Sequence, residues 1–231
     1  MDILLQILMA LAPAVVIALV MVNKDPKPEP KKWLWAAVGL GVLICPVIFL
    51  LALTGYPIYE TDSLTDAILA AFVSAAIPEE LLKFLCLYII ASRCKHFDEM
   101  FDGIVYAVCI GMGFAGLENI LYLFGAEDEW ISVGISRALM SVPMHYFFAI
   151  IMGAFFSLGW FDKKNQKVYM SAALVLPIIV HGAYDTLCFS MGLDENFSFY
   201  ILIAFLLGFK YIRRYVKSLT NSMPRLDGIE S

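Results

Sequence analysis

Long apolar stretches separated by short polar segments dominate the chain. A bilayer-crossing helix needs about 20 consecutive apolar residues. Windows of that kind lie near residues 2–22, 33–53, 65–90, 102–124, 131–160, 169–189 and 197–216. The pattern predicts an all-α membrane protein, a polytopic bundle of about seven transmembrane helices. We expect one multi-pass domain over residues 1–217 and a short cytoplasmic tail over residues 218–231.

Basic residues fall on alternate connections between these windows. Fourteen of the sixteen are Lys24, Lys27, Lys31, Lys32, Arg93, Lys95, Lys163, Lys164, Lys167, Lys210, Arg213, Arg214, Lys217 and Arg225. They occupy the first, third and fifth connections and the C-terminal end. By the positive-inside rule, the N-terminus lies outside and the C-terminus in the cytoplasm. The remaining two, Lys83 and Arg137, lie inside predicted helices.

Composition excludes a soluble globular protein. The chain is 61% hydrophobic and 16% charged, with a mean hydropathy of +0.80. The N-terminus has no basic segment before its first apolar window, so this window is expected to be a permanent span rather than a cleaved signal. The net charge of −5 comes mostly from acids in the outward-facing connections, and no nucleic-acid partner is expected.

The segment Ile77–Lys83, IPEELLK, places three charged side chains within the third window. An ionised side chain near the bilayer centre costs about 2.5–3.5 kcal/mol on insertion scales, so such residues point to function. Pro78 predicts a kink beside the carboxylates. Glu79 shares a helix face with Lys83, and Glu80 is turned away by about 100°. We therefore expect one carboxylate to be partnered and the other to face a cavity.

The fourth and fifth windows each carry further ionisable groups. Small residues at Gly111–Gly116 predict close packing with another helix, and Glu118 and Asn119 follow them. In the fifth window Arg137 and His145 lie eight positions apart, with Ser141 and Pro143 between them. Glu118 has two interpretations: a member of a buried polar cluster, or a carboxyl that is protonated or paired with Arg137.

His181 and Asp185 lie four positions apart in the sixth window, on one helix face. This spacing suits two ligands of one metal, an imidazole oriented by a carboxylate, or a simple buried pair. Across the four windows, four carboxylates and two basic groups sum to −2, which a divalent cation would neutralise. Two histidines and a carboxylate are the ligand set of a catalytic zinc, and a further glutamate serves such sites as general base.

Four motifs in order give the chain a resemblance to PrsW-type intramembrane proteases, relatives of the CAAX prenyl proteases and bacteriocin-processing membrane proteins. They are EExxK (Glu79, Glu80, Lys83), FxxxEN (Phe114, Glu118, Asn119), PxH (Pro143, His145) and HxxxD (His181, Asp185). The stretch KDPKPEP, residues 24–30, is similar to the family's first cytoplasmic link.

The resemblance implies an integral protein of the bacterial cytoplasmic membrane that hydrolyses a peptide bond of a membrane-anchored protein. Such a substrate would be an anti-sigma factor at its first cleavage site. Glu79, Glu80 and His181 would be catalytic, with one glutamate activating water. Zinc would be the cofactor, and its expected ligands are His145, His181 and Glu118. Supporting roles are expected for Lys83, Glu118, Asn119, Arg137 and Asp185.

Two other classes of protein also bury charged residues in a membrane. An ion- or proton-coupled transporter is the main alternative, although the sequence has no internal repeat of paired halves. A seven-helix photoreceptor would need a lysine deep in its last helix, whereas Lys210 lies near the end of that window. A glutamate–histidine mechanism without metal is the alternative to metal-assisted hydrolysis.

Overall fold

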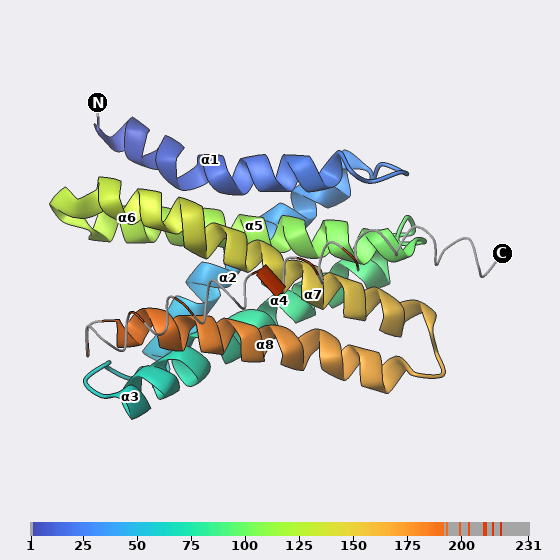
Figure 1. The fold of residues 1–231 in the computed structure, drawn as a ribbon. Coiled ribbons are helices and arrows are strands. Elements are labelled where there is room, and N and C mark those ends of the chain that lie inside the picture. Colours follow the sequence, from blue (N-terminus) through green and yellow to red (C-terminus); the bar gives the residue numbers. More distant parts are fainter. Residues whose placement is uncertain are drawn as a thin grey trace.

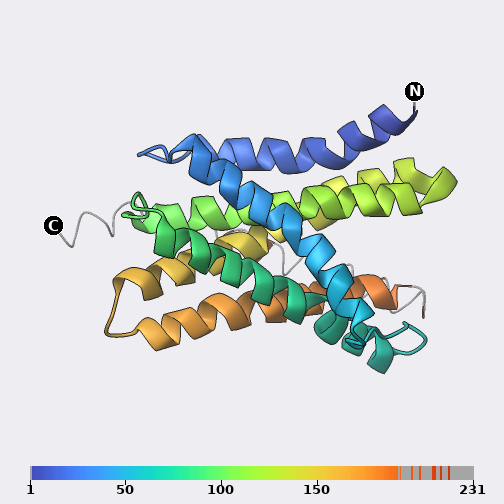
Figure 2. The same cartoon turned by 180° about the vertical axis from the view of Figure 1, so that it is seen from behind.

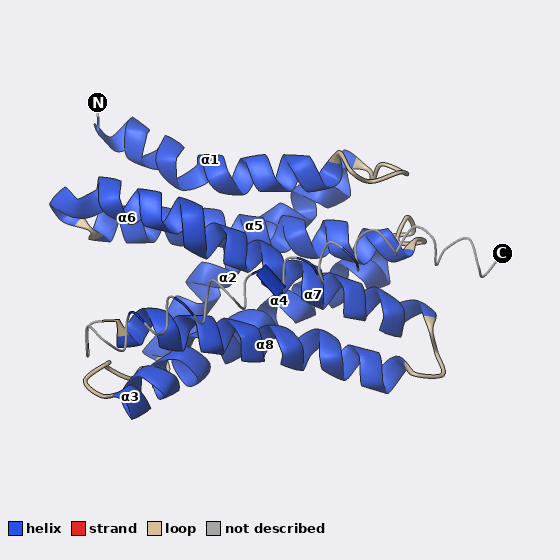
Figure 3. Cartoon of the chain, in the orientation of Figure 1, coloured by secondary structure: helices blue, strands red, loops and turns tan. Residues whose placement is uncertain are grey.

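The computed structural model describes residues 2–191 and 193, and beyond them only residues 199, 203, 210, 211, 214 and 218. Its elements are α1 (Asp2–Val22), α2 (Lys31–Leu53), α3 (Leu64–Leu69), η1 (Ala70–Ala76), α4 (Ile77–Arg93), α5 (Met100–Gly125), η2 (Glu127–Glu129), α6 (Trp130–Ser136), η3 (Arg137–Ser141), α7 (Val142–Phe161) and α8 (Gln166–Ser190). The described part of the chain contains helices and loops and no strand (Figure 3). The predicted all-α class is confirmed.

Among the described residues, five helical stretches are long and apolar enough to cross a membrane: Ile3–Val22, Lys31–Leu53, Met100–Gly125, Glu127–Phe161 and Gln166–Ser190. They match five of the predicted windows. The third window corresponds to the helical run from α3 through η1 to α4, whose middle carries Glu79, Glu80 and Lys83. The seventh window, 197–216, and the predicted tail lie outside the continuously described residues.

Connections between the helices alternate between the two ends of the bundle (Figure 1). The links 23–30, 94–99 and 162–165 lie at one end, and those at 54–63 and 126–129 lie at the other. Lys27 of the first link forms an ion pair with Asp98 of the third, with 2.6 Å between Nζ and Oδ1. The basic links therefore gather at one end, as their alternation along the chain predicts.

Helix α5 occupies the centre and packs against α1, α2 and α7, while α2 crosses the bundle obliquely (Figure 2). Its glycines allow these close approaches. A Cβ atom added at Gly113 would lie 2.3 Å from the carbonyl oxygen of Val38 in α2, and one at Gly111 would lie 3.1 Å from Cβ of Ala149 in α7. Gly116 faces α1 in the same way. The predicted close packing at this stretch is confirmed.

Two short π-helical segments, η1 and η3, precede the helices that carry Pro78 and Pro143. In η1 the N–H of Ile77 donates to the carbonyl of Phe72, and in η3 the N–H of Val142 donates to that of Arg137, five residues back in each case. Pro78 and Pro143 then occupy the first turn of the α-helix that follows, where a missing N–H costs little. The kink expected at Pro78 is thus replaced by a wider turn ahead of it.

The loop at the end of the bundle covers the first of these wide turns. The Tyr56 hydroxyl donates to the Val73 carbonyl at 2.7 Å, and the Ser74 hydroxyl accepts from the Tyr59 N–H at 3.1 Å. Side-chain partners of this kind satisfy polar groups that the altered helical register leaves exposed. π-Helical turns are frequent at functional sites, and both of these precede the ionisable residues of a motif.

Candidate active site

Lys83 joins the two carboxylates of the first motif. Its ammonium nitrogen lies 3.2 Å from Oε2 of Glu79 and 2.7 Å from Oε1 of Glu80, since residues three and four positions apart on a helix are neighbours. The Phe114 ring of α5 packs against the same ammonium, 4.1 Å from the nitrogen to the ring centroid. The expectation that only one carboxylate would be partnered is wrong, because a single lysine reaches both.

Glu80 connects α4 to α8 through His181. Its Oε1 lies 2.9 Å from Nδ1 of His181, whose ring stacks on Phe148 with 4.6 Å between centroids. Gly182 allows α8 to lie close to η1, because a Cβ there would lie 2.4 Å from the Phe72 ring in η1. The plane and the position of the imidazole are therefore both fixed.

The second nitrogen of His181 points to the other carboxylates on that side. Nε2 lies 3.2 Å from Oδ2 of Asp185 and 3.9 Å from Oε2 of Glu79. The predicted contact between His181 and Asp185 on one helix face is confirmed. Each of the two ring nitrogens of His181 thus has a carboxylate as its neighbour.

Glu118 of α5 forms a second network with Arg137 of η3 and His145 of α7. Its Oε2 accepts from Nη2 of Arg137 at 2.5 Å and lies 3.0 Å from Nε2 of His145. Arg137 also donates from Nε to Oδ1 of Asn119 at 2.6 Å, and its guanidinium lies 3.8 Å from the Tyr122 ring centroid. Both interpretations of Glu118 hold together: it is paired with Arg137 and belongs to the cluster.

Three donors from different helices converge between these networks. Glu79, His145 and His181 each offer one ligand atom, and these atoms lie within 4.8 Å of one another. The rings of His145 and His181 meet edge to face, 5.4 Å apart. Nδ1 of His145 is buried and has no hydrogen-bond partner among the described residues. Glu118 lies behind His145, so Glu79 takes the place in this donor group that the sequence assigned to Glu118.

These donors fit a metal ion. Two imidazoles and one carboxylate form a common ligand set of catalytic zinc. Each imidazole has one nitrogen beside a carboxylate from another helix, Glu118 for His145 and Glu80 for His181. This is the arrangement that fixes ring orientation in metal sites. The second nitrogen of His181 also lies beside Asp185, whereas that of His145 has no partner among the described residues. The unpartnered Nδ1 of His145 agrees with a role as ligand of the ion.

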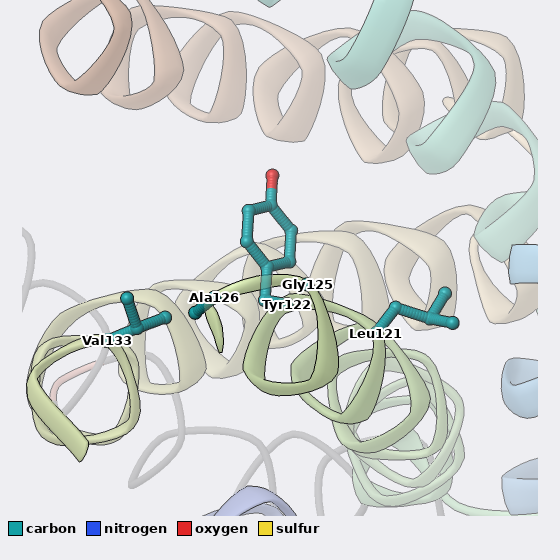
Figure 4. Close-up of a pocket in the computed structure, with 5 residues that line it drawn as sticks. All are labelled: Leu121, Tyr122, Gly125, Ala126 and Val133. Atoms are coloured by element: carbon teal, nitrogen blue, oxygen red, sulfur yellow. The ribbon is translucent and has the colours of Figure 1, made fainter. Parts of the chain in front are cut away.

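The three donor side chains are closed off from solvent in this conformation. Glu79 is 7% exposed, His145 5% and His181 2%. An open pocket of about 400 Å³ lies farther along α5, lined by Leu121, Tyr122, Gly125, Ala126 and Val133. Figure 4 shows Tyr122 standing out from α5, with Leu121 and Val133 on opposite sides. Tyr122 of this pocket contacts Arg137, which belongs to the Glu118 network.

Three aromatic residues around the site were not predicted to be part of it. Phe114 carries a motif position, but its contact with Lys83 depends on how α4 and α5 pack. Phe148 follows His145 by three positions and so shares its helix face, a signal the sequence does contain. Tyr122 follows Glu118 by four positions in the same way. Aromatic residues are too common in membrane helices for this spacing alone to identify them.

Comparison with known proteins gives consistent matches. The family model described as PrsW family intramembrane metalloprotease matches residues 29–209. A curated relative named Protease PrsW from Geobacillus kaustophilus is 34% identical over 160 residues, covering 69% of this chain and 67% of the relative. Relatives of the same name from Clostridioides difficile and Bacillus subtilis are 34% and 35% identical, and cover 73% and 70% of this chain and 71% and 70% of their own length. No solved structure matches the chain.

Proposed function

Because the chain belongs to the PrsW family of intramembrane metalloproteases, we propose that it hydrolyses a peptide bond of a membrane-anchored protein with Glu79, His145 and His181 around the reacting atoms. Family membership makes it an intramembrane protease of the bacterial cell membrane. The comparisons give no support to the transporter alternative. The metal, the substrate and the roles of individual residues are the proposal.

The observation that carries the proposal is the matched support of the two histidines. Glu118 holds Nε2 of His145 and Glu80 holds Nδ1 of His181. The two rings meet in front of Glu79, which supplies the third donor. A buried His–carboxylate pair that served packing alone would not need two such units aimed at one position.

Zinc is the ion that we propose for this donor group. His145 and His181 are the residues that would hold it, and Glu79 lies beside them as the base. When bound, a metal of this kind polarises the scissile carbonyl and lowers the pKa of a bound water. The remaining steps depend on the side chains of this chain.

We assign the proton transfer to Glu79. It belongs to the donor group, and its hydrogen bond to Lys83 is long at 3.2 Å. Glu80 is fully buried, and its Oε1 is held by both Lys83 and His181. Glu79 is therefore the better base. It takes a proton from the water as the oxygen attacks the carbonyl carbon, and gives a proton to the amine nitrogen as the C–N bond breaks.

The buried Lys83 and the half-buried Arg137 are both committed to holding carboxylates in place. Lys83 contacts Glu79 and Glu80, and Arg137 contacts Glu118. Neither is free to follow a developing oxyanion, so stabilisation of that charge falls to the metal and the imidazoles. Because the site is closed, the helices must move to admit water and substrate.

We propose a single-pass membrane protein as the substrate, and a membrane-anchored anti-sigma factor as the first candidate. The test is cleavage of such a substrate, tagged at both ends, by the purified protein in lipid vesicles loaded with zinc. We expect cleavage within or next to the substrate's membrane segment. His181→Ala and Glu79→Ala should abolish it, whereas exposed His96→Ala should cleave like the wild type.

Metal analysis of the same preparations separates the parts of the proposal. Wild type should bind about one zinc per chain, and His145→Ala and His181→Ala should lose it. Cleavage by the wild type without zinc, with no loss on chelation, would overturn the metal assignment and leave a glutamate–histidine protease. Cleavage by Glu79→Ala would overturn the assigned base.

A further inference from the structure

A second group of carboxylates lies at the end of the bundle that carries the basic links. Asp25 and Glu29 belong to the first link, and Asp102 belongs to the first turn of α5. Each offers one ligand oxygen, and these oxygens lie within 4.8 Å of one another. Asp102 and Glu118 are 16 positions apart on α5, which separates them by about 24 Å along the helix axis. The group is therefore distinct from the active site.

All three carboxylates are buried and individually fixed. Their exposed fractions are 7% for Asp25, 7% for Glu29 and 1% for Asp102. Oδ1 of Asp25 accepts from the Lys27 N–H at 3.0 Å, and Oε2 of Glu29 accepts from the Tyr106 hydroxyl. Oδ2 of Asp102 accepts from two backbone N–H groups of the preceding loop, at 2.8 and 2.7 Å. Each side chain is thus positioned by one of its oxygens.

The remaining oxygens are the unusual feature. Oδ2 of Asp25 and Oδ1 of Asp102 are buried and have no hydrogen-bond partner among the described residues. An unpaired buried polar atom costs about 1–3 kcal/mol, and more when it is charged. Two such atoms from different elements, within one cluster of acids, indicate a missing positive partner.

Within the described residues, no basic side chain forms an ion pair with any of the three carboxylates. The ammonium of Lys27, in the same link, lies 2.6 Å from Asp98 and 3.5 Å from Glu99 instead.

We propose that Asp25, Glu29 and Asp102 bind one hard divalent cation of the Mg²⁺ and Ca²⁺ class. Carboxylate oxygens are the ligands that these ions prefer, and waters complete their coordination. The absence of sulfur and nitrogen donors from the group disfavours zinc and other softer metals. A bound ion would fasten the link between α1 and α2 to the start of α5, the central helix of the bundle.

The test is a cation-dependent shift in thermal unfolding. Protein in detergent is stripped with a chelator and then titrated with Mg²⁺ or Ca²⁺ alone, and unfolding is followed with a thiol-reactive fluorophore. All five cysteines are buried or half-buried, so labelling reports unfolding. We expect a saturable rise in Tm of about 5–10 °C at a hundredfold excess over Kd. The ion that acts at the lower concentration is the preferred ligand.

Matched variants locate the site. Asp102→Asn and Glu29→Gln should lose the shift. Glu60→Gln, an exposed acid at the other end of the bundle, should keep it. His181→Ala should also keep it, which separates this site from the active-site metal and makes failure here independent of the proposed protease mechanism.

A direct binding measurement on the wild type covers the case of a variant that does not fold. Tb³⁺ substitutes for Ca²⁺, and its luminescence is sensitised by a nearby tyrosine, here Tyr106 beside Glu29. Excess Ca²⁺ should abolish the signal by displacement. The proposal is overturned if neither ion shifts Tm at millimolar concentration, or if the shift survives in both Asp102→Asn and Glu29→Gln.

Discussion

Glu80 and His181 lie 101 positions apart in the sequence and are joined by a contact of 2.9 Å between Oε1 and Nδ1. This contact connects α4 to α8 and leaves Nε2, which lies 3.2 Å from Oδ2 of Asp185, as the His181 nitrogen for the proposed reaction. It also distinguishes the two adjacent glutamates, since Glu79 lies in the donor group and Glu80 lies behind the imidazole. The two roles can be distinguished by measuring whether added zinc restores the activity of a Glu79 variant or of a Glu80 variant.

Glu80→Gln should weaken metal binding rather than remove the chemistry. Loss of a carboxylate that supports a metal-binding histidine typically costs about 10- to 100-fold in affinity or activity. We therefore expect lower activity that excess zinc largely restores. Glu79→Gln should lose roughly 10²- to 10⁴-fold in kcat, and added zinc should not restore it. Zinc-dependent kinetics of the two variants decide the roles, and the reverse pattern would exchange them.

Lys83→Met should destabilise the fold. It leaves Glu79 and Glu80 adjacent and buried without their shared cation. Removing one partner of a buried ion pair costs about 3–5 kcal/mol. Thermal unfolding should show a clear drop in Tm, whereas Lys164→Met, at an exposed site, should leave it unchanged. Equal Tm values for the two variants would mean that protons already neutralise the glutamates.

Arg137→Lys should impair activity although it keeps the charge. An ammonium cannot reproduce the directed contacts of Arg137 with Glu118 and Asn119 or its stacking on Tyr122. Glu118 would then hold His145 less firmly. We expect weaker zinc binding, measured by competition with a chelating dye, and a smaller change in Tm than in Arg137→Ala. Unchanged zinc affinity would show that Arg137 supports packing alone.

Two neighbouring glycines of α2 should respond in opposite ways to alanine. A Cβ atom at Gly41 would lie 2.0 Å from the carbonyl oxygen of Ile110, whereas one at Gly39 meets nothing within 4 Å. Gly41→Ala must push α2 away from α5, which should lower the free energy of unfolding by about 1–3 kcal/mol or more. Gly39→Ala should be neutral or stabilising by up to about 1 kcal/mol through helix propensity. Thermal unfolding of both variants checks the α2–α5 contact, and a matched loss in both would argue against it.

The sequence identifies the helices because membrane spans are set by length and apolarity. It also identifies the ionisable residues of the site, because charge is rare at that depth. The sequence does not predict which of these side chains contact one another across helices. The place of Glu79 in the donor group, with Glu118 behind His145, depends on how α4, α5 and α7 are rotated, and the two π-helical segments alter that rotation. Helical spacing calculated at 3.6 residues per turn cannot include such a change.

The cluster of Asp25, Glu29 and Asp102 is a second arrangement that the sequence alone does not predict. The pattern of the chain predicts that Asp102 lies near the start of a helix, where a carboxylate interacts favourably with the helix dipole. The capping interaction with Glu99 agrees with this position. Its neighbours come from a link more than 70 positions earlier, and only the packing of α1 and α2 on α5 brings them together.

The wide turns before Pro78 and Pro143 have a consequence for how such an enzyme can change over time. A π-helical turn contains one residue more than an α-helical one, so it can take up a one-residue insertion while the helix beyond it keeps its rotation. The residues before Ala70–Ala76 are thereby offset from those after it by about 100° relative to an unbroken α-helix. Insertion or deletion in these turns is thus a route by which evolution can change the register between the two parts of each helix without replacing Glu79, Glu80 or His145.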